Sequence, residues 1–228
     1  MPKFVNITKK WGNKSIFDSF SLELPPKKVS VILGESGVGK TTLLSIAANL
    51  TDYSGRTEGF ENASFVFQEN RLIESLTARE NVLYAMSSVN LDKQKKNEVI
   101  NAALKSMRAD GYADEVVSKL SGGEKRRVAL SRAFAYPSDV VLMDEPFNSL
   151  DLKLKKEIIT DIKASLDKEK KTVVIVTHSV DEAMFFGEYL VVLRSNEAVV
   201  IGEKKVEERF GYEEDSPLRK NIIKILTE

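Results

Sequence analysis

Nine consecutive residues combine glycines, a lysine and hydroxyl side chains in a pattern suited to binding phosphate. They are Gly34, Glu35, Ser36, Gly37, Val38, Gly39, Lys40, Thr41 and Thr42. Glycines let the backbone fold closely around an anion, so that successive N–H groups point at it. In loops of this pattern the lysine reaches the β- and γ-phosphates of a nucleotide, and the hydroxyl after it binds Mg²⁺. The alternative interpretation is a glycine-rich turn that only joins two elements.

The residues on either side of this phosphate-binding loop are those of a buried strand and a helix. Residues 29–33 form a continuous apolar run, which predicts a buried strand. Residues 43–48 predict a helix that begins at the loop, so its N-terminus would also face a bound anion. A strand, a glycine-rich loop and a helix in this order favour phosphate binding over a simple turn.

Two adjacent carboxylates, Asp144 and Glu145, follow the apolar strand predicted for residues 140–143. Adjacent carboxylates repel each other unless a cation lies nearby. In a nucleotide site an aspartate in this position helps to hold Mg²⁺, and a neighbouring glutamate can accept a proton from an attacking water. We therefore predict a metal ligand at Asp144 and a general base at Glu145.

Two further polar residues, Gln68 and His178, stand at the ends of predicted strands. Gln68 follows residues 63–67, and His178 comes just after the apolar run at residues 173–176. Ligands of open α/β sheets bind beyond the carboxyl ends of the strands. Simpler interpretations are a solvated glutamine and a histidine with a structural role, and the residues alone leave both open.

A second candidate anion site lies where a helix begins at Ser121. Ser121 and Glu124 fit a capping box, which is a sufficient structural explanation for both residues. Gly122 and Gly123, however, destabilise the first turn of a helix, which is unexpected unless something approaches the backbone there. The exposed N–H groups of this turn would suit an anion.

Alternating strands come before the phosphate-binding loop and predict an antiparallel β layer. Residues 5–8 and 19–24 alternate between apolar and polar side chains. We expect a turn over residues 9–14, which contain Trp11, the single tryptophan of the chain. The later strands alternate with helices, which predicts an α/β fold with a parallel-sheet core.

The character of the chain changes after Gln68, where helical patterns replace strands. Thr77 and Glu80 form a capping-box pattern at the start of one helix, and residues 93–107 have the apolar spacing of another. Residues 113–117 are expected to be helical as well. The expected organisation is a first part of the core, an all-helical subdomain, and a second part of the core with a short tail, over residues 1–70, 71–119 and 120–228.

The composition limits the partners of the chain. Its 228 residues contain 34 lysines and arginines and 34 aspartates and glutamates, a balance that does not favour nucleic acid as a partner. Without cysteine, neither a disulfide nor a thiolate metal site can form. The N-terminus lacks the apolar core of a signal peptide, and no run reaches the ~20 apolar residues of a membrane span. We expect a cytoplasmic protein that reaches the inner face of the cell membrane only through partner subunits.

In this order the motifs resemble the nucleotide-binding subunit of ATP-binding-cassette (ABC) transporters, closely from Val5 to His178 and more loosely to Ile201. The residues that carry the resemblance are those at 34–42, Gln68, 120–124, Asp144, Glu145 and His178. It implies a P-loop NTPase (RecA-like) core with an inserted helical subdomain. Residues 68–82 are most similar to the ATPases of nitrate, sulfonate, taurine and thiamine-precursor importers. The segment between Lys40 and Gln68 is shorter than usual in this family, which implies a reduced antiparallel layer.

The resemblance implies roles in a site for ATP and Mg²⁺. It assigns phosphate and Mg²⁺ binding to the lysine and first threonine of the loop, as the residues themselves predict. It places Trp11 against the adenine ring, whereas the competing candidate Phe17 suits core packing better because it comes just before a strand. Gln68 would sense the metal and the γ-phosphate, and His178 would hold the γ-phosphate and the attacking water.

The resemblance also implies a site shared between two copies of the chain. Ser121, Gly122 and Gly123 would bind the γ-phosphate of a nucleotide held by the second copy. Asp151 would organise the interface of this dimer. The two glycines are thereby explained, because the second anion would belong to the partner.

The implied function is ATP hydrolysis that drives solute import through separate membrane subunits. These permease subunits would contact residues 68–76 and the helical subdomain, and an external solute-binding protein would belong to the complex. The alternatives are an exporter motor and an ATP-gated module that regulates a membrane or envelope complex without transport. A DNA-repair cassette does not fit, because no long coiled coil interrupts the chain.

Overall fold

The computed structural model describes residues 1–148, 150, 152–169, 171–203 and 216–227, which fall into two compact units. The first unit comprises Met1–Ala63, Leu142–Glu145 and Thr172–Glu228, and the second comprises Ser64–Val141 and Pro146–Lys171. Among the described residues, no helix is both long and apolar enough to cross a membrane.

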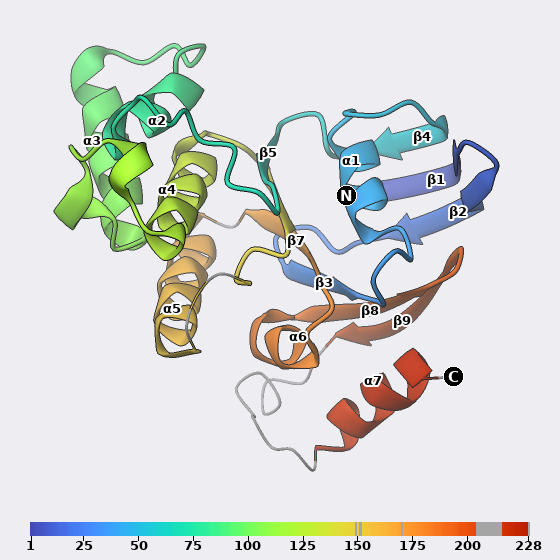
Figure 1. The fold of residues 1–228 in the computed structure, drawn as a ribbon. Helices are drawn as coiled ribbons and strands as arrows, with labels where there is room; N and C mark the ends of the chain where they lie inside the picture. Colours follow the sequence, from blue (N-terminus) through green and yellow to red (C-terminus); the bar gives the residue numbers. More distant parts are fainter. Residues whose placement is uncertain (149, 151, 170, 204–215, 228) are drawn as a thin grey trace. The chain divides into compact units, whose positions relative to one another are not determined.

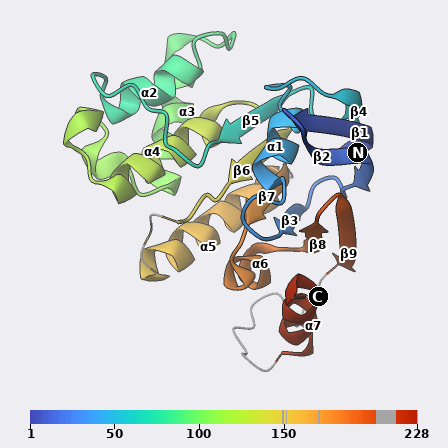
Figure 2. The ribbon, with the colours of Figure 1, turned by 45° about the vertical axis from the view of Figure 1, so that its right-hand side comes forward.

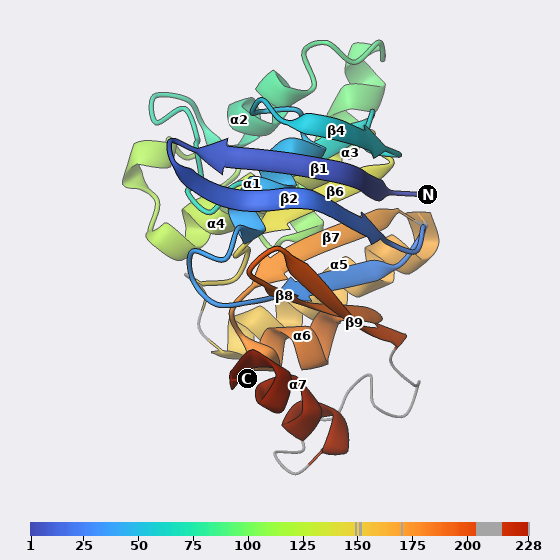
Figure 3. The same cartoon turned by 90° about the vertical axis from the view of Figure 1, so that its right-hand side faces the viewer.

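A three-stranded antiparallel sheet with strand order β2-β1-β4 opens the first unit (Figure 3). Its strands are β1 (Lys3–Trp11), β2 (Lys14–Glu23) and β4 (Ser54–Glu58). The turn expected over residues 9–14 is shorter than predicted, because residues 9–11 pair with β2. Only Gly12 and Asn13 remain in the turn, and the φ of +57° at Gly12 suits glycine.

In the first unit the second sheet has the strand order β6-β7-β3-β8-β9 (Figure 2). The strands are β3 (Val29–Leu33), β6 (Val140–Asp144, its carboxyl half in this unit), β7 (Thr172–Thr177), β8 (Tyr189–Arg194) and β9 (Glu197–Glu203). β3 pairs in parallel with both β7 and β8, and all of its residues are buried. Parallel strands are covered on both faces, which is the physical reason for the apolar run at residues 29–33.

The described residues of the first unit form three helices: α1 (Lys40–Ala47), α6 (Val180–Phe186) and α7 (Pro217–Thr227). α6 packs on β3 and β7, and α7 packs on α6 and β8 (Figure 1). Arg219 of α7 forms an ion pair with Asp181 of α6, and Ile222 of α7 is completely buried. The C-terminal helix therefore stabilises the helix that follows His178.

The described residues of the second unit include the short strand β5 and the helices α2 to α5, and α2, α3 and α4 pack together (Figure 2). The elements are β5 (Ala63–Val66, beside β6), α2 (Ala78–Ala85), α3 (Lys93–Ser106), α4 (Gly122–Ala135) and α5 (Leu152–Glu169). The side chains of Val82, Ile100 and Leu104 are buried between the helices. Thr77 and Glu80 form the predicted capping box at the start of α2.

The expected helix over residues 113–117 is wrong. Two short 3₁₀ helices, Asp110–Tyr112 and Val117–Lys119, lie on either side of most of this segment. Ala78 and Arg79, in the first turn of α2, donate their N–H groups to carbonyl oxygens of the segment at 3.0 and 2.8 Å. The first N–H groups of a helix lack partners within it, so tertiary pairing with α2 replaces a local helix here.

Candidate nucleotide-binding site

The phosphate-binding loop joins β3 to α1 in a conformation that requires glycine. Gly37 and Gly39 have φ angles of +81° and +114°, which side chains rarely adopt. A Cβ on Gly39 would also lie 2.8 Å from Ile16 Cγ2. A Cβ on Gly34 would lie 2.7 Å from the carbonyl oxygen of Leu193. The glycines are therefore needed both for backbone curvature and for close approach of neighbouring strands.

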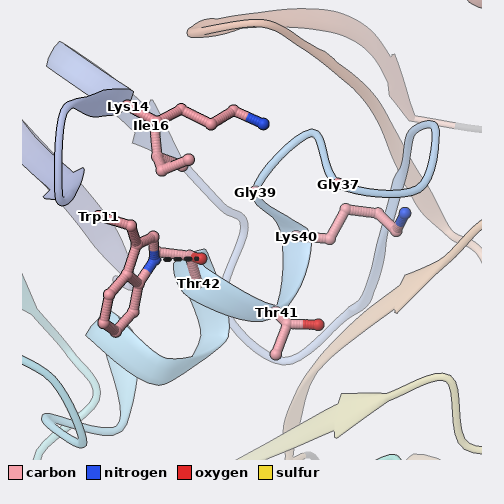
Figure 4. Close-up of a pocket in the computed structure, with 8 residues that line it drawn as sticks. All are labelled: Trp11, Lys14, Ile16, Gly37, Gly39, Lys40, Thr41 and Thr42. Atoms are coloured by element: carbon pink, nitrogen blue, oxygen red, sulfur yellow. Dashed lines mark hydrogen bonds between the residues drawn. The ribbon is translucent and has the colours of Figure 1, made fainter.

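Lys40 is buried beneath this loop, at the start of α1 (Figure 4). Its Nζ donates to the carbonyl oxygens of Gly34 at 2.7 Å and Glu35 at 2.9 Å. Burial lowers the pKa of the ammonium, whereas the nearby carboxylates of Glu145 and Asp144 act to raise it. The structure thus brings the lysine of the loop and the carboxylate pair into one electrostatic environment.

Glu145 is held in an uncommon backbone conformation at the end of β6. Its φ is +45°, in the left-handed region that non-glycine residues seldom occupy. The N–H of Glu145 donates to the carbonyl oxygen of Val176 on β7 at 3.0 Å, which fixes this conformation. The Glu145 side chain is only 10% exposed, and its Oε1 lies 2.8 Å from Nδ1 of His178 in a hydrogen bond. Functional residues are often held in strained conformations by their surroundings.

The oxygen atoms near the loop suit magnesium. Thr41 offers an exposed hydroxyl and Asp144 a carboxylate, and both are hard oxygen ligands of the kind Mg²⁺ prefers. The described part of the chain contains no cluster of three or more His, Cys, Asp or Glu that could hold a metal ion. Mg²⁺ usually completes its coordination with water and nucleotide phosphates. These two residues therefore fit an ion that arrives with its nucleotide.

A pocket of about 310 Å³ lies between the loop and the β1–β2 hairpin (Figure 4). Its lining residues are Trp11, Lys14, Ile16, Gly37, Gly39, Lys40, Thr41 and Thr42. Trp11 is 54% exposed, and its Nε1 donates to Thr42 Oγ1 at 3.4 Å. Phe17, the competing aromatic residue, is completely buried and packs against Phe20. Trp11 is therefore the aromatic ring at the mouth of this pocket.

Ser121 caps α4 in the second unit. Its Oγ donates to Glu124 Oε2 at 2.7 Å, and the Glu124 N–H donates back to this Oγ at 3.3 Å. The bonds from Ser121 lower the pKa of the Glu124 carboxyl. A Cβ on Gly122 would meet no atom of the described residues within 4 Å. The capping box explains Ser121, but packing among the described residues does not explain Gly122.

The backbone around Gln68 is held by two arginines of α4 that the sequence analysis missed. Arg126 is buried and donates to the carbonyl oxygens of Gln68 and Pro146 at 3.2 and 2.6 Å. Arg132 donates to two further carbonyl oxygens of the same loop. The Gln68 side chain itself is exposed. Arg126 lies four residues before the buried Leu130, so helical spacing could have placed it on the buried face.

The predicted site residues fall into two groups in the structure. The first unit brings together the phosphate-binding loop, Trp11, Asp144, Glu145 and His178. Gln68 and the start of α4 belong to the second unit. Asp151 lies outside the described residues.

Comparisons with known proteins found similar sequences. A family model described as ABC transporter matches residues 17–148. The Fe(3+) ions import ATP-binding protein FbpC of Fusobacterium nucleatum is 34% identical, and the match covers 89% of this chain but only 58% of that protein. A probable sulfate/thiosulfate import ATP-binding protein, CysA of Chlorella vulgaris, is 35% identical over 86% of this chain and 89% of that protein.

A solved structure extends the match to three dimensions. It is a dimeric, post-hydrolysis state of the ATP-binding cassette MJ0796 bound to ADP and Pi. This cassette is 29% identical, has a TM-score of 0.78, and is matched over 93% of this chain and 100% of its own. The chain therefore belongs to the ABC transporter family, with the α/β P-loop NTPase fold that its motifs predict.

Proposed function

We propose that this chain binds and hydrolyses Mg-ATP as the ATPase subunit of an ABC importer. The observation that carries the proposal is the hydrogen bond between Glu145 and His178 close to the buried Lys40. A glutamate, a histidine and a lysine in this arrangement suit water attack on a bound phosphate. The ADP and Pi bound to the similar cassette support the same chemistry.

The site residues of the first unit have separate roles in this mechanism. Lys40 exchanges its two carbonyl partners for the β- and γ-phosphates, while the loop N–H groups hold the remaining oxygens. Thr41 and Asp144 would hold Mg²⁺, which neutralises charge on the transferred phosphoryl group. Glu145 accepts the proton of the attacking water. His178 orients the Glu145 carboxylate and contacts the γ-phosphate.

The second half of the site comes from another copy of the chain. Gly122 is unexplained by internal packing, and its missing side chain leaves room for an approaching anion. Ser121 and Gly123 would bind the γ-phosphate held by the partner, with the Ser121 hydroxyl turning away from Glu124. The dimeric state of the similar cassette supports this arrangement. Gln68 and Asp151 retain their predicted roles at the metal and at the dimer interface.

The partners of this dimer would be membrane subunits, which would move when ATP hydrolysis opens the dimer. The curated relatives are named as import proteins, which supports import. Apolar side chains are exposed at Ile73 and, on α2, at Leu83 and Tyr84, and exposed apolar groups favour a protein partner. We propose that residues 71–119 form the docking subdomain, between core parts at 1–70 and 120–228. The complex would lie on the inner face of the membrane with an external solute-binding protein, and the similarity to nitrate-type importers stays a prediction.

Phosphate release by the purified chain tests the proposal. We expect the specific activity to rise with protein concentration, because each site needs two copies, and to vanish when EDTA removes Mg²⁺. The proposed function is contradicted if no phosphate is released at any concentration, even when the membrane subunits that co-purify with the chain are present. Uptake of solute into vesicles containing the reassembled complex tests import separately.

Trp11 provides a direct measure of nucleotide binding. Stacking of an aromatic ring on a base contributes about 1–3 kcal/mol, so Trp11→Ala is expected to weaken ATP binding about tenfold. Trp11→Tyr keeps an aromatic face and should restore most of the affinity. Since the chain has one tryptophan, Mg-ATP should change the emission of the unmodified protein saturably. Unchanged emission at saturating ATP, together with normal affinity of Trp11→Ala, would remove the stacking role.

A further inference from the structure

A buried ammonium group, that of Lys9, lies over the Trp11 ring. Lys9 and Trp11 are two residues apart on β1, and alternation along a strand places them on the same face. Lys9 Nζ lies 4.1 Å from the centroid of the indole ring. Its side chain is only 2% exposed. A lysine is rarely buried to this extent unless a partner holds its charge.

Three oxygen atoms hold the Lys9 ammonium in place. Nζ donates to Thr51 Oγ1 at 2.8 Å, to the Asp52 carbonyl oxygen at 2.7 Å, and to Asp52 Oδ1 at 3.1 Å. An ammonium has three N–H donors, so these bonds fix its direction as well as its charge. The bond from Lys9 also keeps the pKa of the Asp52 carboxyl below its ordinary value.

The ring is therefore fixed from two directions. Lys9 attracts one of its faces by a cation–π interaction, and the bond from Nε1 to Thr42 ties its edge to α1. More than half of Trp11 remains exposed, at the mouth of the pocket beside the loop. The indole is thus held in position while much of Trp11 stays accessible to a ligand.

We propose that Lys9 is a positioning residue for nucleotide binding, which orders the exposed Trp11 ring so that it is ready to stack on the base. This inference rests on the proposed ATP site. A ring that is already ordered loses less conformational entropy when a ligand stacks on it. Lys9 also covers one face of the ring, so a base can stack only on the other face.

Two measurements on the full-length chain test this role. Time-resolved anisotropy of the Trp11 emission, without nucleotide, reports the mobility of the ring, and calorimetric titration with Mg-ATP gives the Kd. For Lys9→Met we expect faster depolarisation and a Kd raised about two- to tenfold, which is the range for ordering one side chain. Lys9→Arg keeps a cation and should recover part of both effects. Lys10→Met, on the exposed adjacent position, should change neither.

A double-mutant cycle separates positioning from a general structural effect. If Lys9 acts through the ring, Lys9→Met should leave the Kd of a Trp11→Ala protein unchanged. An equal loss of affinity with and without the ring would overturn the inference. So would unchanged ring mobility and affinity in Lys9→Met when Trp11→Ala does weaken ATP binding. If the unmodified protein binds no Mg-ATP, the proposed function fails instead, while the anisotropy still reports whether Lys9 orders the ring.

A second variant keeps the inference testable if Lys9→Met does not fold. The Asp52 side chain is 98% exposed, so Asp52→Ala removes one acceptor of the ammonium without opening a cavity. We expect a smaller change in the same direction for both anisotropy and Kd. If Lys9→Met does not fold and Asp52→Ala changes neither quantity, the positioning role is wrong.

Discussion

Glu145→Gln is expected to bind ATP as well as the unmodified chain does but to hydrolyse it at least ~100-fold more slowly, the scale for loss of a general base. The amide keeps an oxygen that can accept a hydrogen bond from His178, so the contact at 2.8 Å can survive. It cannot accept the proton of an attacking water. The variant should therefore accumulate as an ATP-bound dimer, because hydrolysis no longer opens the closed state.

Phosphate release and size-exclusion chromatography with ATP measure these two effects. Glu188→Gln is a matched control, because Glu188 accepts a bond from Val29 N, at the end of β3 opposite the phosphate-binding loop. It makes the same chemical change in the same unit and should leave turnover within about twofold, as a substitution away from the reacting atoms should. Near-normal turnover in Glu145→Gln would place the general base elsewhere.

Ser121→Arg is expected to abolish both dimerisation and hydrolysis while ATP binding to the single chain survives. The substitution places a bulky cation at the start of α4, where Ser121 is exposed, and leaves the phosphate-binding loop intact. It also removes the N-cap, which costs about 0.5–2 kcal/mol of stability. Ser121→Ala loses the same cap without the bulk, so its thermal unfolding and its activity isolate that contribution. Ser88→Arg adds the same charge at another exposed position of the second unit and should be active.

Mixing two inactive variants tests whether the site is shared. Ser121→Arg retains an intact phosphate-binding loop, and Lys40→Ala retains an intact start of α4. A dimer of one copy of each contains one complete site, so mixing should recover part of the hydrolysis that neither variant shows alone. Absence of recovery, when the mixed dimer is shown to form, would mean that each chain uses its own Ser121 or none.

The sequence by itself determined the parts of the site that depend on neighbouring residues. The order of strand, phosphate-binding loop and helix was predictable because glycine conformations, apolar runs and caps are local properties. Gly37 and Gly39 have the positive φ angles that such a loop needs. The positions of Glu145 and His178 at strand ends were also predictable from the sequence, because buried parallel strands are continuous apolar runs.

Only the tertiary structure decided which of these distant residues meet. Glu145 and His178 are 33 positions apart and come together because β6 and β7 are neighbours in the sheet. Residues 113–117 do not form a local helix, because carbonyl oxygens of this segment accept hydrogen bonds from the first turn of α2. Lys9 looks like a surface residue in the sequence but is buried, because oxygen atoms of Thr51 and Asp52, more than forty positions away, hold its charge. Such pairings depend on the summed packing of the whole unit, which local patterns do not contain.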